Sequence, residues 1–191
     1  VLQAITYSNT NTSNPPASVQ IDYTFNDGNV GSQGIGGGGV DSGSINVAIT
    51  AVNDPPAATN LDLVKAYTEG DPSVALDDIV VTDVDSGDTI TATLTLANPA
   101  YGSLTAGSGN GETYAAGTGI WTVTGSVSAV NTALAAVAFV PTTDNDLNTS
   151  ITTHIEDAVG SGPADGVINL NVTPVNDLPV ATASGVITNE D

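Results

Sequence analysis

The amino-acid sequence predicts an all-β protein made of β-sandwich units joined in tandem. Three observations lead to this prediction: short segments alternate apolar and polar residues, clusters of Gly, Pro, Asn and Asp separate these segments, and one phrase occurs twice. Hydrophobic residues make up 40% of the 191 residues, whereas aromatic residues make up only 4%. This composition is typical of many short strands around an aliphatic core.

The repeated phrase reveals the internal organisation of the chain. Residues 43–56 read GSINVAITAVNDPP, and residues 166–179 read GVINLNVTPVNDLP. Upstream of the two copies, residues 19–28 (VQIDYTFNDG) correspond to residues 149–158 (TSITTHIEDA). The sequence therefore predicts repeats of one strand-rich unit.

This alignment divides the chain into three parts. We expect residues 1–55 to be the C-terminal strands of a truncated repeat, residues 56–178 to be a complete repeat, and residues 179–191 to be the first strand of a following repeat. The chain is accordingly expected to be a segment of a longer array.

About eight short strands are expected in the complete repeat. In residues 88–97, Ile90, Ala92, Leu94 and Leu96 alternate with four threonines, which is the period of a strand with one buried face. Similar signals occur at residues 63–68, 102–107, 119–127, 136–140, 150–156 and 167–173. Two sheets of this kind, packed through their apolar faces, form a β-sandwich.

One segment, residues 128–137 (SAVNTALAAV), has helix-forming composition. Ser128 is the predicted N-cap because its hydroxyl can accept a hydrogen bond from the first turn. We expect one or two helical turns that cross between the sheets.

The charge balance is strongly acidic. The chain has 21 Asp and Glu residues against one Lys or Arg, for a net charge of -20 at pH 7. Nucleic acids and anionic membrane surfaces are therefore excluded as partners, since both require clustered Lys and Arg. The chain has no Cys, which excludes disulfides, zinc–thiolate sites and a cysteine nucleophile. Mutual repulsion among the carboxylates predicts that cations are recruited from solution.

The acidic residues gather in short phrases at the ends of predicted strands and in the linkers. Examples are TEGD at 68–71, VTDVDSGD at 81–88, TTDNDLN at 142–148 and the two VND phrases at 52–54 and 175–177. Asp, Glu and Asn supply the oxygen ligands that Ca²⁺ prefers, and Ca²⁺ takes six to eight of them in loose geometry. These phrases therefore predict calcium sites.

The linker and acid phrases resemble those of the cadherin-like calcium-binding repeats of large bacterial surface adhesins, many of which are secreted by the type I pathway. The resemblance covers essentially the whole chain. It implies tandem Ig-like, cadherin-like β-sandwich repeats with Ca²⁺ at each junction between neighbouring repeats.

The resemblance also implies two sets of metal ligands. At the first junction Asn53 and Asp54 of the linker would meet Asp83, Asp85 and Asp157. The set implied for the second junction is Glu69, Asp144, Asp146, Asn176 and Asp177. One departure from the family pattern concerns residues 8–16 (SNTNTSNPP), which contain no acid where the family has an acidic motif. The first junction is therefore expected to hold fewer ions.

The function implied by the resemblance is structural: a calcium-stiffened extender segment of an extracellular bacterial adhesin or matrix or filament protein, secreted or at the cell surface, that serves cell adhesion or biofilm cohesion. Its expected partners are neighbouring repeats of the same chain and other copies of that chain. Two alternatives stay open, a carbohydrate- or protein-binding module and a subunit of a self-assembling extracellular filament.

Three features that could suggest other functions are interpreted as structural. Trp121 is expected in the core and not as a sugar-stacking ring. His154 lies within a predicted strand without a catalytic partner, and the acidic phrases recur along the chain, so an enzyme is not expected. Residues 36–41 (GGGGVD) are expected to form a hairpin loop, because a calcium-binding β-roll needs several stacked copies.

Overall fold

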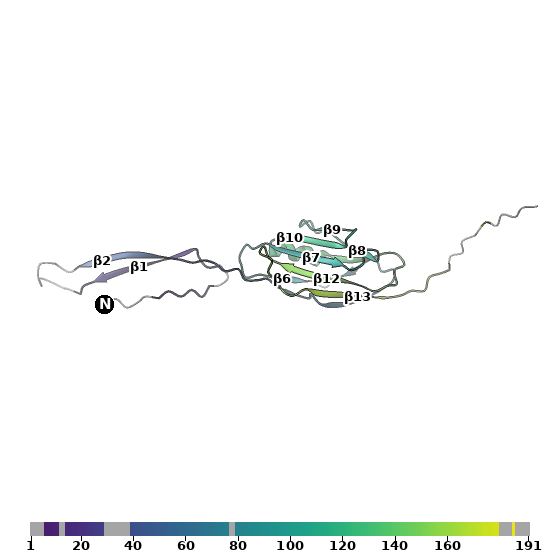
Figure 1. Cartoon of the computed structure of the whole chain (residues 1–191), viewed down its shortest axis with the longest axis horizontal. Helices are drawn as coiled ribbons and strands as arrows, with labels where there is room; N and C mark the ends of the chain where they lie inside the picture. Colours follow the sequence, from purple (N-terminus) through teal and green to yellow (C-terminus); the bar gives the residue numbers. More distant parts are fainter. Residues whose placement is uncertain (1–5, 12–13, 29–38, 77–78, 180–184, 186–191) are drawn as a thin grey trace, which may run out of the picture.

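A computed structural model gives the structure of this chain and describes residues 6–11, 14–28, 39–76, 79–179 and 185. Over these residues the regular structure is β apart from one helix, which confirms the all-β prediction. Figure 1 shows a long hairpin and a sandwich arranged end to end. The predicted strand in 179–191 lies almost wholly outside the described residues, as does the start of the predicted 36–41 loop. The division into repeats stays a prediction.

The hairpin consists of β1 (Ser18–Asn26) and β2 (Val40–Ala48). The two strands are antiparallel, and Ile21 lies opposite Ile45. Their apolar side chains have no second sheet against which to pack in the described structure. Phe25 is 41% exposed and Ile45 is 56% exposed.

The sandwich contains the remaining strands, most of them short. Its main sheet has six strands in the order β4-β13-β12-β7-β10-β9, a second sheet has the order β5-β11-β8, and β3 pairs with β6. Only β13 and β4 are parallel among these pairs. The bounds of the strands are β3 (Ala57–Thr59), β4 (Leu63–Thr68), β5 (Val74–Ala75), β6 (Val80–Thr82), β7 (Ile90–Leu96), β8 (Gly102–Leu104), β9 (Thr113–Ala115), β10 (Ile120–Gly125), β11 (Ala138–Pro141), β12 (Thr149–Glu156) and β13 (Gly166–Thr173).

The core lies between the six-stranded sheet and the layer formed by the smaller sheets and the helix. In β7 every second residue is buried, as the threonine alternation predicts. Trp121 and Phe139 are fully buried. The indole N–H of Trp121 donates to the Thr105 carbonyl oxygen at 3.0 Å, so its one polar atom is satisfied. The predicted core position of Trp121 is confirmed.

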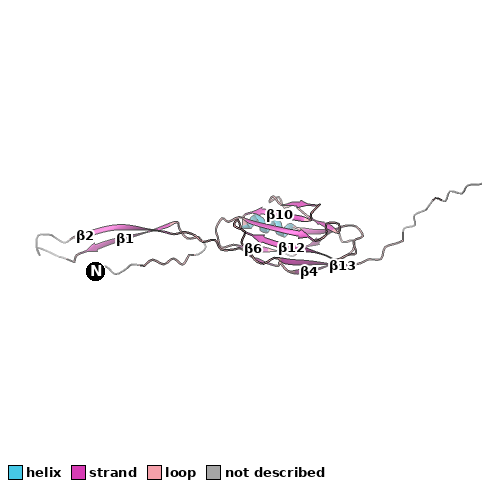
Figure 2. Cartoon of the chain, in the orientation of Figure 1, coloured by secondary structure: helices cyan, strands magenta, loops and turns pink. Residues whose placement is uncertain are grey.

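Helix α1 (Val127–Ala136) begins earlier and is longer than the sequence predicts. Its N-cap is Ser126, whose hydroxyl oxygen accepts a hydrogen bond from the Ala129 N–H at 3.3 Å. Ser128 lies inside the first turn, so its predicted capping role is wrong. The ten residues form nearly three turns. At this length Val130, Ala133 and Leu134 share one face of the helix, and packing of this face into the core stabilises the additional turn. Figure 2 shows this helix within the sandwich. None of the described helical segments is long and apolar enough to cross a bilayer.

Candidate metal centres

The loop between β6 and β7 brings three carboxylates together. Asp83, Asp85 and Asp88 each place one carboxylate oxygen within 4.8 Å of the others. In extended chain, side chains two residues apart share a face, whereas Asp85 and Asp88, three residues apart, would point to opposite faces. Here the Asp85 N–H donates to Asp83 Oδ1 at 2.7 Å, and Gly87 turns the chain back with φ +86°. The loop is thus a turn closed around its own acids.

Two oxygens of this group are buried without a hydrogen-bond donor. Among the described residues, Asp83 Oδ2 and Asp88 Oδ2 have no hydrogen-bond partner. A buried carboxylate oxygen without a donor is costly, and two carboxylates about 4 Å apart repel by about 4 kcal/mol at a surface-like dielectric. A divalent cation would remove both penalties. The residues present therefore fit a hard, oxygen-binding metal ion.

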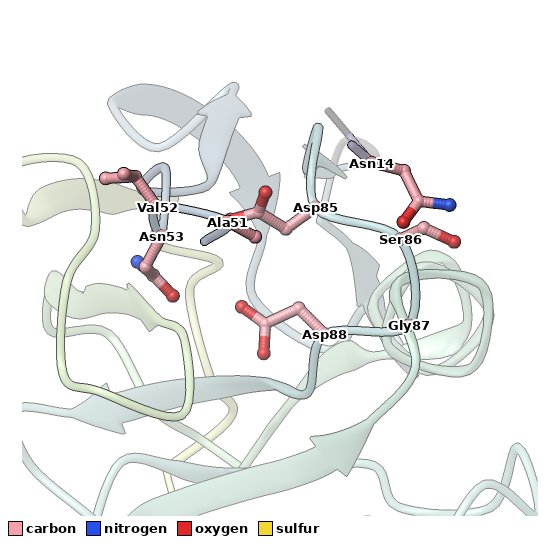
Figure 3. Close-up of a pocket in the computed structure, with 8 residues that line it drawn as sticks. All are labelled: Asn14, Ala51, Val52, Asn53, Asp85, Ser86, Gly87 and Asp88. Atoms are coloured by element: carbon pink, nitrogen blue, oxygen red, sulfur yellow. The ribbon is translucent and has the colours of Figure 1, made fainter. Parts of the chain in front are cut away.

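The linker before the sandwich is attached to the same end. The Asn53 side-chain amide donates to Asp157 Oδ2 at 2.8 Å, and the Asp54 N–H donates to Asp85 Oδ2 at 2.7 Å. Figure 3 shows the linker on one side of a hollow, with Asp85 and Asp88 on the other side. This hollow has a volume of about 350 Å³. The five residues predicted for the first junction therefore lie at one end of the sandwich.

Asp157 is held in its charged form by its hydrogen bonds. Its side chain is almost fully buried, and Oδ1 accepts from the N–H groups of Ser161 and Val159 at 2.8 and 2.9 Å. The hydrogen bond from Asn53, together with those from the backbone, holds the pKa of Asp157 below its ordinary value, although burial acts in the opposite direction. A buried carboxylate that stays charged is suited to a cation site.

Sequence reasoning missed two residues at this junction. Asp88 is the third member of the acidic group, although it stands in the same VTDVDSGD phrase as the other two. Asn14 lines the hollow from the segment before β1, where the sequence has Asn in place of the expected acid. An amide side chain four residues before the first strand was the available signal, because an Asn carbonyl oxygen is also a calcium ligand.

A second acidic group lies at the opposite end of the sandwich, where β13 leaves it (Figure 1). Glu69, Asp144 and Asp177 each have a carboxylate oxygen within 4.8 Å of the others. β4 and β13 run parallel, so their C-terminal ends lie at the same end of the sheet. Glu69, which follows β4, and Asp177, which lies beyond β13, therefore meet there. The Val175 N–H donates to Glu69 Oε2 at 2.8 Å, which ties the chain after β13 to the end of β4.

Two other residues predicted for the second junction lie differently. Asp146 is exposed and does not belong to the three-carboxylate group. The Asn176 side-chain amide donates to the Asp177 carbonyl oxygen at 3.2 Å. Between the two acids of the 144–146 phrase, Asn145 is buried and donates to the Tyr67 hydroxyl at 3.1 Å. The metal role of all ten predicted residues stays a prediction, while their positions define two candidate centres.

Both groups consist of oxygen donors alone. This chemistry favours Ca²⁺ or Mg²⁺ over zinc or copper, which prefer nitrogen and sulfur. At the first centre the ion would be held by the carboxylates of Asp83, Asp85 and Asp88, and Asn53 lines the same hollow. Calcium tolerates this irregular arrangement better than Mg²⁺, which requires near-octahedral geometry.

Comparison with known proteins gives little further identification. No protein-family model matches the chain, and no curated protein sequence matches it. Among solved structures, the human desmocollin-1 ectodomain is similar with a TM-score of 0.39 and 14% sequence identity. The match covers 84% of this chain and 28% of the desmocollin-1 chain, so the chain spans less than a third of that protein. No family is assigned at this level of similarity.

Proposed function

We propose that the chain is a calcium-stiffened structural extender in which Ca²⁺ binds at the junction between the linker and the sandwich. The observation that carries this proposal is the direct attachment of Asn53 and Asp54 to Asp157 and Asp85. Because the linker already contacts the acidic group, an ion bound there would be shared by both sides of the joint. Sharing an ion removes orientations that a bare linker would allow.

The two prolines after Asp54 add stiffness of their own. Proline fixes φ, and Pro56 is buried against the sandwich. Two hydrogen bonds and two prolines still leave the three carboxylates at the joint unneutralised. Calcium therefore sets how rigid the joint is, and the prolines set a lower limit.

In this proposal the chain is part of a secreted or cell-surface adhesin or matrix protein of bacterial type, serving adhesion or biofilm cohesion. The arrangement of the centres supports it, because the two candidate sites lie at opposite ends of the sandwich, as an end-to-end array requires. The neighbouring repeats of the same chain are the partners that such sites would connect.

A second candidate is a filament subunit whose hairpin is completed by another copy of the chain. It is favoured by the exposed apolar residues Phe25 and Ile45 and by the outer edges of β1 and β2, which pair with no further strand among the described residues. Light scattering in the presence of calcium distinguishes the two candidates. The measured mass of an extender stays that of a monomer, whereas the mass of a filament-forming chain rises with protein concentration.

Calorimetric titration tests the calcium proposal. Extracellular calcium modules bind with dissociation constants of about 10⁻⁴ to 10⁻³ M. Asp85→Asn keeps an oxygen that can accept from Asp54 but removes the charge, and we expect it to weaken binding about tenfold or more. Asp62→Asn is the matched control: it removes the same charge, keeps the acceptor for the Val167 N–H, and lies outside both groups.

Two outcomes would contradict the proposal. Absence of calcium binding in the parent chain would remove its basis. Equal losses in the two variants would mean that calcium only screens the net charge of the chain. Small-angle scattering of the parent in calcium and in chelator then measures stiffness, and we expect the longer maximum dimension in calcium.

A further inference from the structure

An uncharged hollow lies on the outer side of the main sheet, remote in sequence from the calcium phrases of the first junction. It has a volume of about 490 Å³ and is formed where β7 ends, β12 begins and β13 passes. The side chains that line it include Asn98, Tyr101, Asn148, Ser150, Asn169 and Asn171. We propose that this hollow binds a neutral carbohydrate.

Two of the amides are fixed as hydrogen-bond donors. Asn98 Oδ1 accepts from the Ala100 N–H at 3.0 Å, and Asn148 Oδ1 accepts from the Val172 N–H at 2.9 Å. Because a backbone N–H requires an acceptor, these bonds assign the oxygens and leave each Nδ2 group to donate elsewhere. The donors are held in place before a ligand arrives, which lowers the entropy lost on binding.

Two further amides are available as both donors and acceptors. Asn169 and Asn171 alternate with the buried Ile168 and Leu170 along β13, so they share the outer face. Neither side chain makes a hydrogen bond to another described residue. Sugar hydroxyls also donate and accept, so neighbouring hydroxyl groups can pair with such amides. The Tyr101 ring adds an apolar surface of the kind on which sugar C–H groups pack.

Charge selects the class of ligand. The chain carries a net charge of -20, yet none of the described Asp, Glu or Lys residues lines this hollow. An anionic ligand would be repelled by the surrounding field, and a cation would find no carboxylate. An extended peptide is disfavoured because the Val172 N–H, which could pair with an added strand, already binds Asn148. A neutral polyhydroxyl compound satisfies the remaining groups.

The hollow is specific to the sandwich. The strand alignment places Ser18 of the hairpin at the position of Asn148 and Ala48 at the position of Asn171, whereas Asn46 stands at the position of Asn169. The hairpin therefore keeps one of these amides and lacks two. A shallow site of this kind is expected to bind with a dissociation constant of about 1 mM.

The test is a nuclear magnetic resonance titration of the whole chain in calcium. The probes are methyl glucoside, methyl mannoside, methyl galactoside and N-acetylglucosamine, each up to about 100 mM because millimolar affinity is expected. Glucuronate and triglycine are the charged and peptide comparisons. At least one neutral sugar should shift the amide signals of residues 98–101, 148–150 and 169–171 in a saturable way.

Asn169→Ala should weaken this binding about fivefold or more, whereas Asn46→Ala, the matched change on β2, should leave it unchanged. Both side chains are exposed, so folding is retained. The proposal is overturned if no neutral sugar gives saturable shifts, if triglycine or glucuronate shifts the same signals, or if the two variants behave alike. None of these results bears on calcium binding at the linker.

Discussion

The strand pairs β1–β2 and β12–β13 have the same register but different surroundings. Ile21 lies opposite Ile45, and their counterparts Ile151 and Ile168 lie opposite each other. Yet Ile45 is 56% exposed, whereas Ile168 is fully buried. The two strand pairs thus share the same residue pairing but differ in how deeply the paired side chains are buried.

The difference shows which level of structure each property depends on. Register follows from the alternation of apolar residues along two neighbouring strands, which is a local property. Burial depends on the layer that packs against the pair: Ile151 and Ile168 face the core of the sandwich, whereas the hairpin has no second sheet against it in the described structure. Full burial of one aliphatic side chain is worth about 1.5–3 kcal/mol, so the sandwich pair gains stability that the hairpin pair lacks.

The largest expected effect is that of truncating the paired isoleucines. Ile168→Ala should lower the free energy of unfolding by about 2–5 kcal/mol, because it leaves a cavity in a closed core. Ile45→Ala should change it by about 0.5 kcal/mol or less, since the side chain is exposed. Urea unfolding followed by the fluorescence of Trp121, which lies in the sandwich core, measures the first, and hydrogen exchange of the β2 amides measures the second. Similar losses in the two variants would mean that the hairpin is covered in solution.

A matched pair of glycines sharpens the comparison. A Cβ atom on Gly166 would overlap the backbone carbonyl of Leu61, whereas on Gly43 it would overlap the hydroxyl end of Tyr23. The carbonyl of Leu61 is held by the buried Thr153 hydroxyl at 3.2 Å, so it cannot move away freely. The Tyr23 side chain belongs to the hairpin and can rotate.

We therefore expect Gly166→Ala to destabilise the sandwich by about 1–3 kcal/mol, as overpacking typically does. Gly43→Ala should be close to neutral, within about 0.5 kcal/mol. The same urea experiment decides this, with hydrogen exchange of the β2 amides as a second measurement for the hairpin. A large loss from Gly43→Ala would indicate that Tyr23 is as firmly fixed as the core.

The strands of the sandwich were predictable because their signals are local. Residues 63–68 form a strand with the predicted bounds, and the apolar residues of β13 (Ile168, Leu170 and Val172) form its less exposed face, as the alternation in 167–173 indicates. The start of the helix could not be predicted in the same way, because Ser126 and Ser128 are both residue types that cap helices. Only the core contacts of Val130 and Leu134 select the earlier one.

The candidate metal centres were predictable in residue type and less so in geometry. The sequence indicates acids at 144 and 146, but the left-handed φ of +57° at Asp144 and the burial of Asn145 decide which acid joins the group. The backbone conformation at Asp144 and the burial of Asn145 depend in turn on the hydrogen bond between Asn145 and Tyr67, which is distant in sequence. Asp88 joins the first group only because Gly87 turns the chain back, which the one-dimensional pattern does not show.

The smallest expected effect concerns His154 on β12, whose position in the hairpin is occupied by Thr24. His154 Nδ1 lies 2.6 Å from Asp165 Oδ1, and Nε2 lies 3.4 Å from Glu156 Oε2. The hydrogen bond with Asp165 raises the pKa of His154; burial opposes this rise, and Glu156 adds to it. The opposite residue on β7, Thr93, is uncharged.

Because the folded-state pKa is raised, the charged His154 should stabilise the protein fully below its unfolded pKa of about 6.5. This contribution should be lost as the pH rises through the higher folded value. The side chain is 43% exposed, so solvent screening leaves a contribution near the lower end of the range of about 0.2–1 kcal/mol for exposed pairs.

Proton resonance titration of the imidazole measures the pKa of His154, and Asp165→Asn should lower this pKa. Thr24→His is the matched control. Asn26 and Ser42 stand there in place of the two acids, and the acids nearest in sequence are Asp22 and Asp27, so the pKa of this histidine should rise less. Equal pKa values at positions 24 and 154 would show that the overall negative charge of the chain, and not the two neighbouring acids, sets the protonation of His154.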